Sequence, residues 1–388
     1  MLRVLAIAGY RSLRDVRLEL GALTVVTGPN GAGKSNLYRA LRLLQETALG
    51  GAIGSLAREG GLSSVLWAGP EQLGRSVRRG EHPVQGTIRK EPISLRIGFA
   101  DDDFSYSVEF GIPVTMSSAF ASDAEIKREL VWVGSTWRTG AALVDRRMGL
   151  VQARDGSGAW DIVADSLPLH HSLLASVADP RAAPAALLLR ERLRTWRFYD
   201  GFRTDPDAPA RQLQIGTRTL ALANDGRDLA AALQTIREMD GAADLDEAVS
   251  DAFPGARLEV LVESGARFGV ELHQRGLLRP LSQAELSEGT LRYLLWIAVL
   301  LTRAPPALMV LNEPETSLHP DLLPALARLI VKASGQGQVW VVTHSPLVRD
   351  LLEAARGCRP LALAKEMGET VVVGQRTSTR PAWKWPAR

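Results

Sequence analysis

The chain has 388 residues, enough for a sizeable core and one to three domains, and its 46% hydrophobic and 23% charged content indicates a soluble globular protein. The formal net charge of +3 permits a nucleic-acid partner but does not argue for one. The single cysteine, Cys358, excludes an internal disulfide and a cysteine-rich metal site, and it fits a reducing cytoplasm. The N-terminus has no signal-peptide core, and the longest strongly apolar run, residues 293–301, is too short to span a bilayer, so we expect no membrane association.

The first strong signal is a glycine-rich loop between a strand and a helix. Residues 2–7 and 16–20 read as two strands, and the apolar run 23–27 leads directly into residues 28–35. That segment matches the phosphate-binding pattern G-x-x-x-x-G-K-[ST], and a helical pattern follows at residues 36–44. Strand, glycine loop and helix in this order predict a nucleotide-binding site.

The residue types of this loop fit the chemistry of a bound triphosphate. Glycines let backbone N–H groups converge on phosphate oxygens, and the start of the helix adds unpaired donors and a positive dipole end. Lys34 is expected to reach the β- and γ-phosphates of ATP, and the Ser35 hydroxyl to ligate Mg²⁺. The predicted nucleotide-binding residues of the loop are Asn30, Gly31, Gly33, Lys34, Ser35 and Asn36.

An antiparallel β region follows the loop and its helix. Residues 50–61 are glycine-rich and are expected to form a loop, and the basic side chains between residues 75 and 90 are best read as a solvated surface. Strict alternation at residues 93–99 and 104–110 around an acidic turn predicts a hairpin. Further β signals occur at residues 130–133 and 150–151.

The middle of the chain is predicted to be helical. Apolar residues recur at helical spacing in residues 167–177, 185–196, 228–239 and 245–253. Prolines divide this region, and no heptad pattern continues long enough for a coiled coil. A second hairpin, residues 258–272, follows.

The last third alternates helices with buried strands. Residues 291–302 form a helix that is apolar nearly all round and is therefore expected to be buried. The apolar strand 307–311 ends at Asn312 and Glu313, and the strand 339–343 ends at His344. This alternation predicts a mostly parallel sheet, whose strand ends lie on one rim beside the phosphate-binding loop.

Four pieces in this order resemble the ABC-type ATPase heads of the RecF/SMC/OLD group: the loop, residues 286–289, the strand ending at Glu313, and His344. The resemblance covers about residues 1–47 and 216–375. Residues 11–13 and 224–229 also resemble the small stand-alone predicted ATPases of that group. The implied fold class is α/β: a P-loop NTPase head with a mostly parallel sheet flanked by helices, an antiparallel β lobe and a helical insertion. We divide it into lobes at residues 1–165, 166–255 and 256–388.

The resemblance implies roles for the residues that match its motifs. Ser287 and Gly289 match the signature that faces the γ-phosphate of ATP held by a second protomer, so that two heads enclose two nucleotides. Glu313 matches the carboxylate that activates the attacking water, and His344 the switch histidine. With Lys34 they are the predicted catalytic residues.

Other assignments from the resemblance are less specific. Arg11 is a candidate nucleotide contact, and residues 317–319 lie where a dimer-contacting loop belongs. The glutamine of the Q-loop is not identified, with Gln72 and Gln152 as candidates. Asn312 stands where the family usually has an aspartate that helps to hold Mg²⁺, and an amide lacks that charge, so we expect weaker Mg²⁺ binding and slow turnover.

Each residue also has a structural interpretation. Ser287 could be only a helix N-cap, Glu313 a solvated acid at a strand end, His344 a packed or capping histidine, and His319 the start of a helix. The functional interpretations are preferred because the four pieces agree with one another.

The resemblance and the spacing predict an ATPase head without an attached effector. No long coiled coil fills the gap before Ser287, and residues 345–388 are too few for a nuclease domain. One hypothesis is a Mg²⁺-dependent ATPase that dimerises around two ATP and acts with DNA, in repair or in defence against foreign DNA. The alternative is an ATP-gated switch that regulates a separate effector protein, and a third is an ATP-binding protein with negligible turnover.

Overall fold

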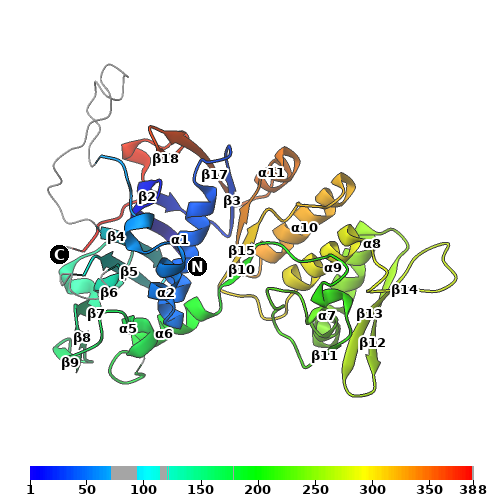
Figure 1. The fold of residues 1–388 in the computed structure, drawn as a ribbon, viewed down its shortest axis with the longest axis horizontal. Helices are drawn as coiled ribbons and strands as arrows, with labels where there is room; N and C mark the ends of the chain where they lie inside the picture. Colours follow the sequence, from blue (N-terminus) through cyan, green and yellow to red (C-terminus); the bar gives the residue numbers. More distant parts are fainter. Residues whose placement is uncertain (71–93, 114–119, 121, 178, 387–388) are drawn as a thin grey trace. The chain divides into compact units, whose positions relative to one another are not determined.

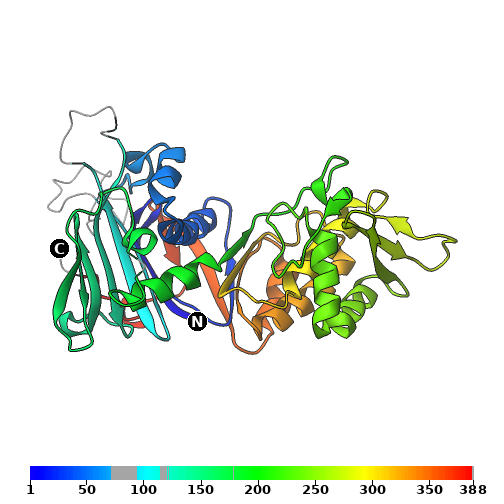
Figure 2. The same ribbon diagram turned by 90° about the horizontal axis from the view of Figure 1, so that it is seen from below.

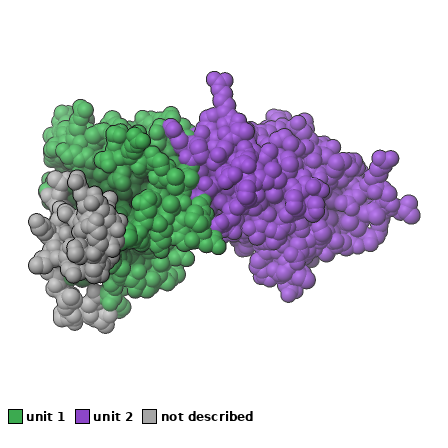
Figure 3. Space-filling model, turned by 90° about the horizontal axis from the view of Figure 1, so that it is seen from above, with its two compact units in different colours: residues 1–21, 28–196, 361–388 green, residues 22–27, 197–360 purple. Residues whose placement is uncertain are grey.

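The computed structural model describes residues 1–70, 94–113, 120, 122–177 and 179–386. The predicted basic cluster between residues 75 and 90 and the candidate Gln72 lie outside these residues. The chain forms two compact units (Figure 3), each discontinuous in sequence. Unit 1 comprises residues 1–21, 28–196 and 361–388, and unit 2 comprises residues 22–27 and 197–360. The three predicted lobes are continuous segments, and their boundaries remain predictions.

Unit 1 is built on an eight-stranded antiparallel sheet with the strand order β2-β1-β4-β5-β6-β7-β8-β9 (Figure 1). The strands are β1 Leu2–Tyr10, β2 Leu13–Glu19, β4 Ser94–Asp101, β5 Phe104–Gly111, β6 Glu125–Val133, β7 Ala142–Arg147, β8 Leu150–Arg154 and β9 Trp160–Ala164. The predicted hairpin is confirmed as β4 and β5, with Phe99 opposite Tyr106. Both are buried, as the alternation of apolar residues requires.

Both faces of this sheet are covered in its central strands. On one face Phe99 packs against Trp196, with ring centroids 6.0 Å apart. On the other face Trp132 packs against Trp383 from the C-terminal segment at 5.4 Å. A β-carbon on Gly98 would lie only 2.6 Å from the Trp383 ring, so a residue without a side chain is needed there.

Among the described residues, the helices of this unit are α1 Lys34–Leu49, α2 Ala52–Arg58, α3 Leu62–Val65, α5 Leu173–Ser176 and α6 Pro184–Arg194. Helices α1 and α6 pack on each other and against strands of the sheet (Figure 2). The expectation of a loop at residues 50–61 is wrong, because α2 forms there, with Ala52 and Leu56 buried. The glycines that suggested a loop stand mostly at the helix ends, where Gly60 and Gly61 have positive φ.

A C-terminal hairpin joins β17 Cys358–Glu366 to β18 Glu369–Val372. The strands are antiparallel, with Leu363 opposite Val372. From residue 361 onward this hairpin belongs to unit 1, where Thr370 donates its backbone N–H to the carbonyl of Ser12 at 2.8 Å. The end of the chain thereby supports the segment next to the glycine loop.

Unit 2 contains the predicted parallel sheet, with neighbouring strands in the order β10-β15-β16-β3. These strands are β10 Arg197–Tyr199, β15 Leu308–Asn312, β16 Gln338–Val342 and β3 Leu23–Thr27. All three pairings are parallel. Val26, Val342 and Asn312 are partners in register, so the carboxyl ends of β3, β16 and β15 are level.

Helices surround the sheet of unit 2: α7 Leu229–Ile236, α8 Ala242–Ala252, α9 Glu288–Leu300, α10 Leu323–Ser334 and α11 Pro346–Glu353. Helix α9 packs on α7, α8 and α10 (Figure 1), which explains why it is apolar nearly all round. Residues 294–300 are all buried, as the sequence predicts. The predicted middle helices form at α6, α7 and α8, whereas residues 167–177 give only the single turn α5.

The second predicted hairpin is confirmed as β12 Arg257–Glu263 and β13 Arg267–His273. Strands β11 Gln214–Ile215 and β14 Leu281–Ser282 both pair with β13. In the described ranges, no helix has the length and apolar character needed to cross a bilayer.

Candidate functional site

The glycine loop folds as the pattern predicts. Gly28, Gly31 and Gly33 have φ of 143°, 79° and 108°, values that glycine adopts without steric cost. Asn30 and Gly31 are exposed, and around Gly31 no described atom lies within 4 Å of where a β-carbon would be. The loop therefore presents backbone groups that a ligand can approach closely.

Lys34 begins helix α1 and folds back over the loop. Its side chain is 5% exposed, and Nζ donates to the carbonyls of Gly28 at 2.6 Å and Pro29 at 3.0 Å. Ser35 follows with an exposed position in the first turn of the helix, which contains no acidic residue. The helix start therefore combines a cation, a hydroxyl and the positive end of the helix dipole, an arrangement suited to phosphate.

Ser12 and Thr370, which lie outside the motif, form hydrogen bonds that support this loop. The Thr370 hydroxyl donates to the carbonyl of Ala32 at 2.8 Å and lies 2.7 Å from the Ser12 hydroxyl. The Asn36 amide donates to the same Ser12 oxygen at 2.8 Å. Asn36, a predicted ligand-binding residue, is thus part of the loop's support. The motif does not predict the role of Thr370, because this residue belongs to a hairpin far along the chain.

Arg11 lies in a charged cluster of unit 1. Its Nη2 and Nε atoms contact Glu59 Oε2 at 2.6 and 3.1 Å, and the Tyr10 hydroxyl donates to the same carboxylate at 2.9 Å. Burial acts to lower the pKa of Arg11, but hydrogen bonds to Glu59 and Tyr10 raise it overall. Arg11 has a positive φ of 48°, and its role as a nucleotide contact remains a prediction.

Glu313 follows β15 with an unusual backbone. Its φ is 50°, in the left-handed region that a non-glycine residue adopts at some cost. Its N–H donates to the carbonyl of Val342 at 2.8 Å, which ties it to the end of β16. The side chain is 43% exposed, and Oε1 lies 3.3 Å from His344 Nε2. The structure thus brings together these two predicted catalytic residues, and strained backbone of this kind concentrates at functional sites.

Glu315, two residues after Glu313, is not among the site residues predicted from the sequence. Its Oε1 accepts hydrogen bonds from the Thr343 hydroxyl at 2.5 Å, from the His344 N–H at 3.0 Å and from the Ser345 N–H at 3.1 Å. The carboxylate therefore joins the segment after β15 to the segment after β16.

The predicted signature residues begin helix α9. Ser287 is the N-cap, and its exposed hydroxyl accepts from the Thr290 N–H at 3.2 Å. The structural interpretation of Ser287 is therefore observed, and its exposure leaves room for a second role. A β-carbon on Gly289 would lie 3.5 Å from the carbonyl of Ser317, so the signature lies close to the predicted dimer-contacting loop.

Arg292 connects α9 to that loop. Its Nη1 donates to the carbonyl of Thr316 at 2.9 Å, and Nη2 donates to the Phe202 carbonyl at 2.9 Å and to the Thr204 hydroxyl at 3.1 Å. Burial lowers the pKa of this arginine. His319, by contrast, is a capping residue: its Nδ1 accepts from the Asp321 N–H at 3.3 Å, as the alternative interpretation expects.

The donor set for a magnesium ion consists of oxygen atoms. The Ser35 hydroxyl is exposed at the start of α1, and the Asn312 side chain is half-buried at the end of β15. Hydroxyl and amide oxygens are each ligands that Mg²⁺ accepts, and Asn312 carries one charge fewer than an aspartate would; that the two residues hold one ion remains a prediction. Gln152, the described Q-loop candidate, pairs with Asp145 and Ile162 inside the antiparallel sheet, and its assignment remains a prediction.

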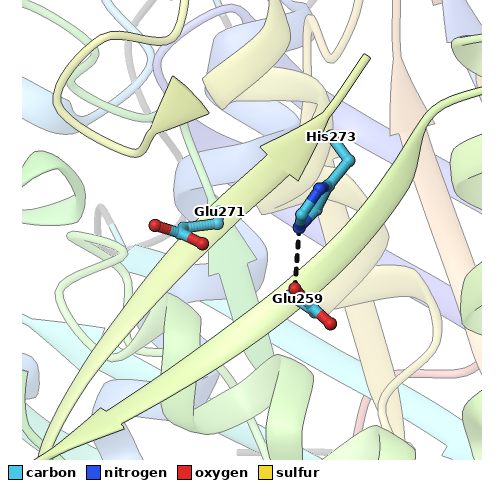
Figure 4. Close-up of side chains that lie close together, drawn as sticks. All are labelled: Glu259, Glu271 and His273. Atoms are coloured by element: carbon cyan, nitrogen blue, oxygen red, sulfur yellow. Dashed lines mark hydrogen bonds and ion pairs between the residues drawn. The ribbon is translucent and has the colours of Figure 1, made fainter. Parts of the chain in front are cut away.

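A separate cluster of acidic groups and a histidine lies on the β12–β13 hairpin (Figure 4). Glu259, Glu271 and His273 place their ligand atoms within 4.8 Å of one another, and His273 Nε2 lies 2.7 Å from Glu259. Sequence spacing does not reveal this group, because Glu259 and Glu271 meet by strand register. Arg257, two residues before Glu259 on the same strand, also contacts it at 3.1 Å, so the Glu259 carboxylate is paired within the hairpin.

Comparisons with known proteins agree with this geometry. A family model described as "AAA domain, putative AbiEii toxin, Type IV TA system" matches residues 23–350. A segment of 44 residues is 48% identical to the OLD nuclease of Thermus scotoductus (strain ATCC 700910 / SA-01), and it covers 11% of this chain and 8% of the nuclease.

Solved structures of Smc heads have a fold similar to that of this chain. The crystal structure of the Smc head bound to the C-winged helix domain of ScpA is 13% identical, covers 97% of this chain and 98% of that chain, and superposes with a TM-score of 0.51. An Smc head with an extended coiled coil derived from Pyrococcus furiosus is 13% identical, covers 96% and 95% of the two chains, and gives a TM-score of 0.49. The predicted α/β fold of an ABC-type head and the resemblance to the RecF/SMC/OLD group are confirmed. The chain therefore belongs to the AAA-domain family whose model it matches over residues 23–350.

Proposed function

We propose that this protein binds ATP with Mg²⁺ at the glycine loop and hydrolyses it slowly. Lys34 and the loop N–H groups hold the phosphates, and Ser35 and Asn312 hold the ion. Mg²⁺, when bound, neutralises phosphate charge, while Glu313 accepts a proton from the attacking water and His344 contacts the γ-phosphate. The carrying observation is the Glu313–His344 pair at 3.3 Å, in which Glu313 has a left-handed φ of 50° just after β15 and His344 follows the end of β16.

The register of β3 with β16 supports the proposal that the glycine loop acts together with Glu313 and His344. Val26 of β3 is in register with Val342 of β16, and two residues after Val26 the chain enters the loop. Ligands of open α/β sheets bind at the carboxyl ends of the strands. The ends of β3, β15 and β16 are level in unit 2, as that rule requires.

We further propose that ATP drives dimerisation of two heads. Ser287 and Glu288, at the start of α9, are exposed. A helix start of this kind favours an anionic group such as the γ-phosphate of a partner's nucleotide. In the same protomer, residues 316–317, at the start of the predicted dimer-contacting loop, lie beside the start of α9.

The experiment combines nucleotide binding with mass measurement. Lys34→Ala is expected to abolish ATP binding, and Glu313→Gln to bind ATP but trap a dimer, which light scattering detects. Glu263→Gln, at the exposed end of β12, is the matched control and should behave as the wild type. Undiminished ATP affinity in Lys34→Ala would refute the site, and a Glu313→Gln protein that stays monomeric with ATP would refute the dimer.

The downstream role is proposed to involve DNA. Support comes from the short match, over 11% of this chain, to a protein named OLD nuclease. ATP-dependent DNA binding should weaken steeply with added salt. The alternative, a switch that regulates a separate effector, is favoured by Asn312, which removes charge from the ion site and so favours slow turnover. Copurification of a stoichiometric partner without DNA-stimulated hydrolysis would select it.

A further inference from the structure

We infer that Glu315 is a positioning residue that orients His344 toward Glu313. This inference deepens the proposed ATPase function and rests on it for its catalytic consequence. Glu315 hydrogen-bonds a threonine hydroxyl and two backbone N–H groups. It acts through the backbone on either side of the histidine.

The first step is that Glu315 has a fixed position. Its own carbonyl accepts from the Leu318 N–H at 3.1 Å, and the Glu313 carbonyl accepts from the Thr316 N–H at 3.0 Å, so the segment folds as consecutive turns. Arg292 holds the Thr316 carbonyl from the other side. A side chain that extends from this segment is therefore anchored.

The second step is that one carboxylate oxygen organises the segment that carries the histidine. Oε1 accepts from the Thr343 hydroxyl and from the N–H groups of His344 and Ser345. Thr343 is buried, and Ser345 caps α11 by accepting from the Val348 N–H. The backbone of His344 is thus clamped between a buried strand end and a helix start. A charged acceptor makes such hydrogen bonds about twice as strong as a neutral one.

The third step concerns the second oxygen of the Glu315 carboxylate, Oε2. Oε2 is buried, and the described part of the chain offers it no hydrogen-bond partner. A half-buried carboxylate with one oxygen fully used and one left unpaired is costly, so it is hard to explain as surface solvation. Its position between the two strand ends is explained if it sets the distance of 3.3 Å between Glu313 Oε1 and His344 Nε2.

The kinetic test uses Glu315→Ala, Glu315→Gln and the exposed control Glu353→Ala at the end of α11. Loss of such an outer support typically costs 10–100-fold in activity, so kcat of Glu315→Ala should fall by about that factor while ATP affinity stays near that of the wild type. Glu315→Gln keeps an acceptor oxygen and should recover part of the rate. In a His344→Ala background the Glu315 substitution should cost little more, because both act through one group.

A second readout does not depend on turnover. In histidine-labelled protein, the His344 imidazole signal, assigned by its loss in His344→Ala, should move in Glu315→Ala and less in Glu315→Gln, while the His319 signal stays in place. Failure of the wild type to hydrolyse ATP would count against the proposed function alone. An unmoved His344 signal in a folded Glu315→Ala protein, or additive losses in the double variant, would overturn the role of Glu315.

Discussion

The Thr370 hydroxyl occupies the space that a side chain on Gly33 would need. A β-carbon built on Gly33 would lie 2.1 Å from Thr370 Oγ1 and 3.1 Å from Ser12 Oγ. The same threonine oxygen donates to the Ala32 carbonyl, so it cannot move without releasing the loop. Gly33 also has φ of 108°, which a residue with a side chain adopts only with strain. The C-terminal hairpin therefore fixes the shape of the glycine loop.

Gly33→Ala is expected to weaken ATP binding by about tenfold or more, since strained backbone costs on the order of 1–3 kcal/mol and about 1.4 kcal/mol is a factor of ten. Calorimetric titration with ATP measures this. Gly140→Ala is the control, because φ there is not positive and no described atom lies within 4 Å of the added carbon. Thr370→Ala in the Gly33→Ala protein removes the overlap but not the backbone strain, so it should restore binding only in part. Wild-type affinity in Gly33→Ala would contradict the assigned loop geometry.

Asn312→Asp is expected to make the ATPase bind Mg²⁺ more tightly and turn over faster. Asn312 ends β15 next to Glu313, and a carboxylate there would return a full charge to the ion site. The rate measured against Mg²⁺ concentration should reach half-saturation at lower Mg²⁺, with faster turnover. Asn224→Asp, in the loop before α7, serves as the control for added charge. An unchanged Mg²⁺ curve would show that position 312 does not contact the ion.

The parallel sheet and its strand-end residues were predictable because local patterns carry them. The buried strands read as continuous apolar runs, and parallel pairing then brings the ends of β15 and β16 together with Glu313 and His344. The glycine loop needs only local backbone chemistry, so its motif is enough. Helix α9 was predictable as a buried helix because its residues are apolar nearly all round from Tyr293 onward.

The supports of the site were not predictable in the same way. Thr370 meets Ser12 across most of the chain's length, and no short-range pattern records that contact. Nothing in the local sequence around Glu315 shows that it accepts from the His344 backbone, because strand pairing brings the two segments together. The glycines at residues 50–61 suggested a loop because a helix C-terminus and a loop use the same residue type.

Arg146→Met is expected to destabilise unit 1 strongly. Arg146 and Glu129 are both fully buried and lie 2.7 Å apart, and removing one charge leaves the other uncompensated. Breaking such a pair costs about 3–5 kcal/mol, whereas replacing both partners is often close to neutral. Chemical denaturation should therefore show a large loss for Arg146→Met and a recovery in Arg146→Met with Glu129→Leu. The recovery will be incomplete, because Glu129 also accepts from the Tyr106 and Ser172 hydroxyls. A double variant as unstable as the single one would contradict the charge explanation.

Tyr106 should make the protein lose stability in alkali. Burial, and then the nearby charge of Glu129, raise the pKa of Tyr106 well above its ordinary value of 10. Because the folded pKa is the higher one, its contribution to stability is complete below pH 10 and falls as pH rises toward the folded value.

Tyr106→Phe lacks the hydroxyl that donates to Glu129 at 2.6 Å, so it should be less stable than the wild type at neutral pH. Above pH 10 the wild type loses the Tyr106 contribution and the variant has none to lose, so the difference between their free energies of unfolding should shrink. Denaturant titrations of both proteins across this range measure that difference, and a gap that stays constant with pH would contradict the proposed burial of the Tyr106 proton.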